Sequence, residues 1–174
     1  MSFVHRIFVE KKPGFDVAAR SLLQDLKSNL GVSGLEGVRL LIRYDVAGLT
    51  NEEYQTARNT IFAEPPVDYV YDEQVPIAKG ETVFAIEYLP GQYDQRADSA
   101  AQCIQVITHK QPPAVNAAQV LVLRGKLSKK DLAARLNKAV GAGFVVEAPD
   151  GLWMLLSHLS TGCQPVSASA TSQP

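Results

Sequence analysis

Apolar side chains in the first thirty residues follow two different spacings. Residues 3–9 are rich in β-branched and aromatic side chains, which predicts a strand ending at Glu10 or Lys11. Apolar residues then recur every three or four positions, which predicts a helix with one buried stripe. This stripe consists of Ala19, Leu22, Leu23, Leu26 and Leu30. Asp16 is positioned to cap the helix and Gly31 to end it.

A second strand and a second helix follow. Residues 38–46 alternate in polarity, which predicts a half-exposed strand. Its two faces are Val38, Leu40, Ile42 and Tyr44 on one side, and Arg39, Leu41, Arg43 and Asp45 on the other. Thr50 and Glu53 have the spacing of a capping box, so we expect a helix from there to about Ala63. A short strand over 67–72 should close this half of the chain.

The same order of elements returns after a predicted hinge at 74–81. We expect a strand over 82–88, a helix capped by Asp94, and a strand over 117–124. The buried stripe of this helix should be Ala97, Ala101, Ile104 and Ile107 or Thr108. Ser128 and Asp131 repeat the capping box and should open a last helix through Leu132, Leu136 and Val140.

The residues themselves also repeat. The segment 9–16 returns as 86–94 with one inserted residue, and an offset of 78 then relates Asp16 to Asp94 and Ser21 to Ser99. Such a period is one small α/β unit, so the sequence predicts a fused, pseudo-symmetric dimer. The expected fold is α+β, with two ferredoxin-like β-α-β-α(-β) repeats over 1–75 and 76–142. Residues 143–174 form a divergent tail, whose Ser/Thr-rich end we expect to be disordered.

Composition excludes several classes of protein. The chain has 174 residues, 46% of them hydrophobic, and a net charge of −1, which argues against a nucleic-acid partner. Two cysteines, Cys103 and Cys163, form no disulfide framework and favour a reducing compartment. The first residues have no signal-peptide pattern and no apolar run is long enough to span a membrane, so we expect a cytoplasmic protein.

The sequence contains no motif typical of catalysis or metal binding. The three histidines have no metal-ligand spacing, and the sequence has no phosphate loop or nucleophile elbow. We therefore predict no catalytic residue, metal or cofactor in this chain. Cys103 is expected to be a small core or interface residue. Arg39 and Arg43 share one strand face and are weaker candidates for holding a phosphate, although such a pair is more often solvated or subunit-facing.

A polar segment around the start of the second long helix is the main candidate site. It joins a turn, a cap and several polar side chains at a helix N-terminus, where backbone N–H groups favour anions or the carbonyls of a partner. The candidates for an interface or ligand are Pro90, Gly91, Asp94, Gln95, Arg96, Asp98 and Ser99. The alternative is a well-capped surface helix, which the matching segment 13–19 largely is.

Three segments carry a resemblance to a known family. Residues 9–16, 43–46 and 87–102, including Leu89-Pro90-Gly91-Gln92-Tyr93-Asp94, resemble the N-terminal region of single-chain phosphoribosylformylglycinamidine synthases. The resemblance covers about 3–138 and implies two fused copies of a PurS-like subunit, which is an assembly element. Its partners would be the ATP-binding synthase and glutaminase domains, and homo-oligomerisation stays open. The parent enzyme uses ATP, Mg²⁺ and glutamine-derived ammonia in purine biosynthesis, whereas this chain alone is expected to be inactive.

The resemblance ends near Asn137. The segment 141–146 is unrelated, and no charged residue follows Asp150, so we hypothesise that residues after about 140 come from a shifted reading frame in a truncated protein. Two other hypotheses stay open. The chain could itself be a ligase, or it could be a small-molecule-binding regulatory domain of ferredoxin-like type with an effector between its repeats.

Overall fold

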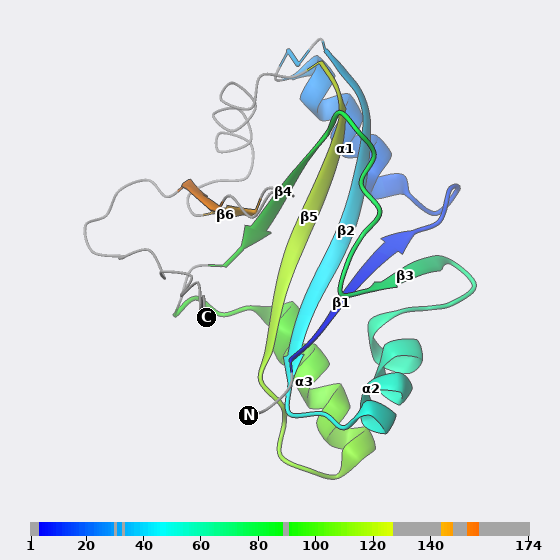
Figure 1. Cartoon of the computed structure of the whole chain (residues 1–174), viewed down its shortest axis with the longest axis vertical. Helices are drawn as coiled ribbons and strands as arrows, with labels where there is room; N and C mark the ends of the chain where they lie inside the picture. Colours follow the sequence, from blue (N-terminus) through cyan, green and yellow to red (C-terminus); the bar gives the residue numbers. More distant parts are fainter. Residues whose placement is uncertain are drawn as a thin grey trace, which may run out of the picture.

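The computed structural model describes residues 4–29, 31–32, 34–88, 91–126, 144–147 and 153–156. Within them the fold is α+β, as predicted: a five-stranded antiparallel sheet with three α-helices, an arrangement compatible with the ferredoxin-like type (Figure 1). The elements in chain order are β1 (Val4–Lys11), α1 (Val17–Ser28), β2 (Leu35–Ala47), α2 (Asn51–Ala57), the π-helix η1 (Arg58–Phe62), β3 (Asp68–Asp72), β4 (Glu81–Glu87), α3 (Gln95–Thr108), β5 (Val115–Gly125), β6 (Phe144–Glu147) and β7 (Trp153–Leu156).

The strand order in the main sheet is β3-β1-β2-β5-β4, so the two long strands β2 and β5 lie at its centre. Ile42 of β2 pairs with Gln119 of β5, and the pairing extends from Leu35 to Val46. Both faces of β2 are covered: Leu41 is fully buried and Arg43 is 4% exposed on one face, and Tyr44 and Val46 are buried on the other. The prediction of a half-exposed strand is therefore wrong, because sequence alternation alone does not reveal what covers the polar face.

Two apolar clusters cover the sheet face that packs against the long helices. In the first, side chains of α1 pack against strands that come later in the chain. Its buried members include Leu26 of α1, Leu35 of β2, Phe84 of β4, and Leu121 and Leu123 of β5, with Leu22 and Ile86 packed against them. In the second, side chains of α3 pack against the earlier strands. Its corresponding members are Ala100 and Ile104 of α3, Ile7 and Val9 of β1, and Tyr44 and Val46 of β2. Each long helix thus helps to bury strands from the other half of the chain.

The opposite face of the sheet is crossed by the segment between β3 and β4, which runs in front of the sheet in Figure 1. Val75 and Ile77 of this segment pack on a third cluster that includes Leu41, Val120 and Val122. The predicted hinge at 74–81 does connect the two halves. It is also a packed cover, which accounts for part of the burial of β2.

The helix ends confirm some capping predictions and correct others. The capping box of Thr50 and Glu53 is present, with Thr50 N–H donating to Glu53 Oε2 at 2.9 Å. Asp16 stands at the N-cap of α1, but its carboxylate makes no cap hydrogen bond. It accepts from Gly14 N–H at 3.0 Å and pairs with Arg20. The prediction of a side-chain cap there is wrong because these two groups take the carboxylate instead.

The buried stripe of α3 also differs from the prediction. Its buried residues are Ala97, Ala100 and Ile104, whereas Ala101 is partly exposed and Ile107 is 41% exposed. The helix is rotated about its axis relative to the predicted stripe, since Ala100 and Ile104 face the second cluster.

Several sequence predictions lie outside the described residues. These are the helix through Leu132 to Val140 with its capping box, and the boundary at residue 142. Of the segment 143–174, the structure describes only β6 and β7, which pair antiparallel with each other.

Candidate functional site

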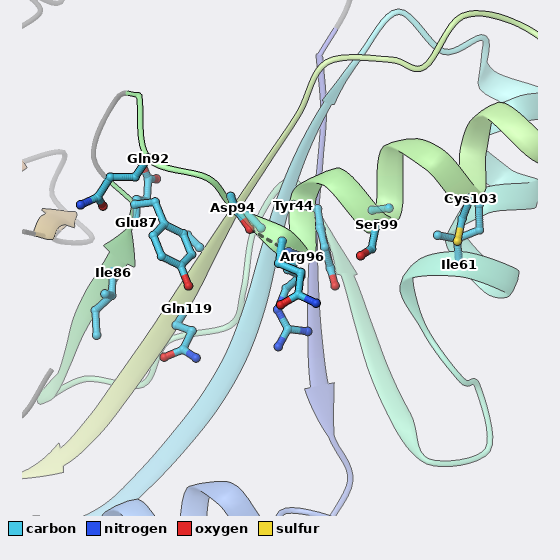
Figure 2. A pocket seen from close by; sticks show the side chains of 15 residues that line it. Tyr44, Ile61, Ile86, Glu87, Gln92, Asp94, Arg96, Ser99, Cys103 and Gln119 are labelled. Carbon is cyan, nitrogen blue, oxygen red and sulfur yellow. Dashed lines mark hydrogen bonds between the residues drawn. The ribbon is translucent and has the colours of Figure 1, made fainter.

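The predicted polar segment borders a pocket of about 780 Å³ between the N-terminus of α3 and the sheet (Figure 2). The pocket has polar residues at its rim and small or apolar residues along the helix and strands. The described lining residues are Tyr44, Ile61, Ile86, Glu87, Tyr88, Gln92, Asp94, Gln95, Arg96, Ser99, Ala100, Cys103, Ala117, Ala118 and Gln119. Four of the predicted candidates, Asp94, Gln95, Arg96 and Ser99, are therefore brought together.

Asp94 fixes the start of α3 beside this pocket. Its Oδ1 accepts hydrogen bonds from the backbone N–H groups of Arg96 and Ala97, both at 3.0 Å, as the sequence predicted. The helix N-terminus is thus occupied by the chain's own carboxylate. Gly91 precedes the cap with a φ of 87°, which favours glycine in this turn. Pro90, another candidate, lies outside the described residues.

The side chains of Gln95, Arg96 and Ser99 make no hydrogen bond or ion pair with any residue that the structure describes. The same holds for Gln119, which β5 contributes from the far end of the sequence. Figure 2 shows Arg96 and Gln119 projecting into the same space. These donors and acceptors are therefore available to a bound molecule.

Asp98, although predicted with this group, does not line the pocket. Its Oδ2 accepts from Tyr93 Oη at 2.8 Å and from Gln102 Nε2 at 2.7 Å. The hydrogen bond to Asp98 raises the pKa of Tyr93 above its ordinary value. Asp98 belongs to a separate surface group on α3.

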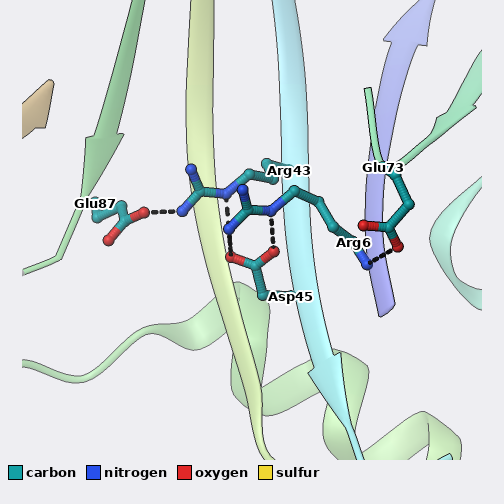
Figure 3. A network of polar contacts seen from close by, with 5 residues as sticks. All are labelled: Arg6, Arg43, Asp45, Glu73 and Glu87. Carbon is teal, nitrogen blue, oxygen red and sulfur yellow. Dashed lines mark hydrogen bonds and ion pairs between the residues drawn. The ribbon is translucent and has the colours of Figure 1, made fainter. Parts of the chain in front are cut away.

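Arg39 and Arg43 lie on one face of β2, as predicted, and both guanidinium groups contact carboxylates. Arg39 makes two hydrogen bonds of 2.7 Å to Glu10, and these raise its pKa. Arg43 pairs with Asp45 at 3.2 Å and with Glu87. Figure 3 shows this network, which Arg6 extends through its hydrogen bonds to Asp45. Binding of a phosphate by these arginines stays a prediction.

A smaller pocket of about 340 Å³ lies at the matching place beside α1. Its lining includes Glu10, Lys11, Asp16, Ala18 and Leu40.

Three residues that line the larger pocket were not predicted from the sequence: Gln119, Ala100 and Ala117. The available signal was the alignment of the two halves, where alanines in the second half replace leucines of the first.

The remaining candidates for chemistry are dispersed. Among the described residues, no three His, Cys, Asp or Glu side chains are grouped closely enough to hold a metal ion. His5 is buried and stacks on Tyr54, with ring centroids 4.1 Å apart. Cys103 is exposed at the pocket wall, so the expectation of a core position is wrong, and an interface role stays a prediction. In the part of the chain that the structure describes, no helix is long and apolar enough to cross a membrane.

Comparison of the chain with family models, with curated proteins and with solved structures gave no match.

Proposed function

We propose that this chain is a non-catalytic assembly domain of a phosphoribosylformylglycinamidine synthase, built from two fused PurS-like repeats. It would hold the ATP-binding synthase and glutaminase domains together for ammonia transfer. The observation that carries this proposal is the mutual packing of the halves, since each apolar core combines the long helix of one half with strands of the other. The choice of this enzyme family rests on the sequence resemblance of residues 9–16, 43–46 and 87–102.

The composition of the two cores supports a duplicated, pseudo-symmetric origin. Strand residues of the second cluster recur 77 positions later in the first cluster: Ile7, Val9, Tyr44 and Val46 correspond to Phe84, Ile86, Leu121 and Leu123. Helix residues recur after 78 positions, where Leu22 and Leu26 correspond to Ala100 and Ile104. Six corresponding pairs in two cores are what fusion of the subunits of an isologous dimer would produce.

Strand register gives independent support. Val9 pairs with Ile42 in the first half, and the residues 77 positions later, Ile86 and Gln119, also pair. Ile42 in turn pairs with Gln119 at the centre of the sheet. A two-fold axis perpendicular to the sheet at this last pair would exchange β1 with β4 and β2 with β5.

Exposed aromatic residues beside the pocket suit an interface role. Tyr88 is 60% exposed and Tyr93 is 70% exposed, and they flank the candidate segment on both sides of Gly91. Large exposed apolar side chains next to polar ones are typical of protein contact sites, where tyrosine is enriched. We place the partner contact of the proposed assembly domain on this surface, together with Asp94, Gln95, Arg96, Asp98 and Ser99.

Reconstitution tests this function. The purified chain is mixed with a phosphoribosylformylglycinamidine synthase that lacks its own PurS-like region, and complex formation and glutamine-dependent turnover are measured. We expect a complex, and weaker binding for Tyr93→Ala than for Phe15→Ala, the exposed aromatic beside α1. Absence of a complex with the unmodified chain would reject the assembly function.

The regulatory hypothesis is the second candidate, and the pocket of about 780 Å³ is the observation that favours it.

A further inference from the structure

The two matching pockets of the chain differ in size and in chemistry. The pocket beside α3 encloses about 780 Å³, against about 340 Å³ for the one beside α1. Ligand pockets commonly range from about 300 to 1,000 Å³, so the larger one has room for a small organic molecule. Because the halves correspond in sequence, the smaller pocket serves as an internal reference for the larger.

Residues that fill the first half are small in the second. Leu22 and Leu40 correspond to Ala100 and Ala117, both of which line the larger pocket. Replacing leucine by alanine in a packed site removes buried apolar surface and lowers folding stability. Packing alone therefore does not explain why Ala100 and Ala117 are small. These two alanines leave space beside α3, whereas Leu22 and Leu40 fill the corresponding space beside α1.

Residues at the rim change in the opposite sense, from apolar to polar. Val17 and Ala18 at the start of α1 correspond to Gln95 and Arg96 at the start of α3. The smaller pocket also contains cationic residues, but Lys11 pairs with Asp68 at 2.8 Å and Arg39 with Glu10 at 2.7 Å. Arg96 has no such carboxylate partner among the described residues. A wider pocket with an uncommitted guanidinium is suited to an organic anion.

We propose that this pocket binds a free amino acid. A single guanidinium matches one carboxylate, with which it forms two parallel hydrogen bonds. A dianionic phosphate fits less well, because the pocket contains Asp94 and the two N–H groups at the helix start already donate to it. The Oδ2 atom of Asp94 has no partner within the described residues and accepts from the ammonium group. Gln95, Ser99 and Gln119 contact polar atoms of the side chain, while Ile86, Ala100 and Ala117 contact its carbon atoms.

This site shares Asp94, Gln95, Arg96 and Ser99 with the proposed partner contact, but binding of an amino acid to the isolated chain does not require the assembly function. It rests on the correspondence of the halves and on the pocket, whereas the assembly function is tested by complex formation. A failure of complex formation would therefore not affect the amino-acid titration, and a failure of the titration would not affect complex formation.

The test is a nuclear magnetic resonance titration of the ¹⁵N-labelled full chain with each standard amino acid. Every amino acid is paired with its own α-carboxamide, which lacks the charge that Arg96 would bind. Adenosine monophosphate and inorganic phosphate are titrated in parallel. We expect at least one amino acid to shift the amide signals of residues 92–100 and 117–119, and its carboxamide to bind at least about tenfold more weakly, as expected for a lost charged hydrogen bond.

Three variants locate the binding. Arg96→Gln should weaken affinity about tenfold or more through the same lost charged contact. Ala117→Leu, which installs the residue of the first half, should abolish binding while the spectrum stays dispersed. Arg20→Gln removes an exposed arginine near the start of α1 and should leave affinity unchanged. The proposal is overturned if no amino acid binds, if carboxamides bind equally well, if only the phosphate compounds bind, or if Arg96→Gln binds as tightly as the unmodified chain.

Discussion

The guanidinium of Arg43 in β2 crosses over β5 to form an ion pair with Glu87 in β4 (Figure 3). Ala118 of β5 pairs with both residues, so all three lie in one row of the sheet. The small side chain of Ala118 leaves the path open, and the ion pair connects a strand of the first half to a strand of the second. This contact therefore links β2 to β4 across the strand that lies between them.

Breaking this ion pair should destabilise the whole sheet. Because the Arg43 side chain is 4% exposed, Arg43→Leu leaves Glu87 without its partner and should cost about 3 kcal/mol of unfolding free energy. Arg43→Leu combined with Glu87→Leu should recover part of this loss, since no uncompensated charge remains. Urea unfolding of both variants measures the difference. Equal losses for the single and double variants would show that the ion pair does not account for the effect.

Ala118 provides a second test of the same row. Ala118→Leu places a branched side chain in the path of Arg43, and overpacking of a buried position costs about 1–3 kcal/mol. We expect this cost to be smaller in the Arg43→Leu background, because no guanidinium then has to cross over position 118 to reach Glu87. A double-mutant cycle by urea unfolding measures this coupling. Additive losses would mean that Ala118 and Arg43 do not interact.

The two helix caps should differ in strength although both residues are aspartates. Asp94 accepts two backbone N–H groups at 3.0 Å, so Asp94→Ala should cost about 1 kcal/mol of unfolding free energy. Asp16 makes no cap hydrogen bond to α1, and Asp16→Ala should have a smaller effect. Thermal and urea unfolding of both variants compare them. A larger loss at Asp16 would contradict this account of the caps.

The spacing of apolar residues predicted most of the strands and helices, because apolar side chains recur at about every second residue in a strand and every third or fourth in a helix. Thr50 with Glu53 and Asp94 identified helix starts correctly, since a cap is a contact between near neighbours in sequence. The same reasoning gave a wrong prediction at Asp16, because Gly14 N–H and Arg20 bind its carboxylate in place of the helix N-terminus. Coverage of β2 was missed because Val75 and Ile77 reach it from a segment without regular structure.

The candidate site was predicted only on its helix side. Asp94, Gln95, Arg96 and Ser99 are consecutive or one turn apart, so their proximity follows from the helix itself. Gln119 and Ala117 come from β5, and the sheet order that brings them beside α3 is a property of the whole fold. Asp98 was grouped with the site because sequence proximity does not specify which way a side chain faces; its partners are Tyr93 and Gln102.

Glu53 should make stability depend on pH in the acidic range. A hydrogen bond from Lys110, and a second from Thr50 N–H, lower the pKa of Glu53 from its ordinary value of 4.5 to about 2. A lowered carboxyl pKa stabilises the folded state above the unfolded value, and this contribution is lost as the pH falls from 4.5 towards 2. Urea unfolding across this range should show a weaker pH dependence for Glu53→Gln than for the unmodified chain.

Glu52 is the matched control for this measurement, because it lies in the same helical turn and has no ion pair with Lys110. Glu52→Gln should leave the acid limb of the stability curve nearly unchanged. Identical acid limbs for Glu53→Gln and the unmodified chain would instead show that the contact with Lys110 does not persist in solution.

The first half alone should form a homodimer if the chain arose by fusion. A two-fold axis at Ile42 would pair β2 of one copy with β2 of another, as β2 now pairs with β5. In that register Arg39 of one copy faces Asp45 of the other, so opposite charges meet across the strands. In the intact chain these positions face Val122 and Asn116 instead.

Residues 1–75 expressed alone test this origin. We expect light scattering to give a dimer mass, because a single copy would leave the α1 side chains Leu22 and Leu26 without Phe84 and Leu121. Ile42→Cys should form an intermolecular disulfide on oxidation, since directly paired Cα atoms lie about 4.5–5.5 Å apart. Val46→Cys is the matched control, because its position would face Val38 of the other copy and not itself. A monomeric fragment, or equal cross-linking of both variants, would count against a fused dimer.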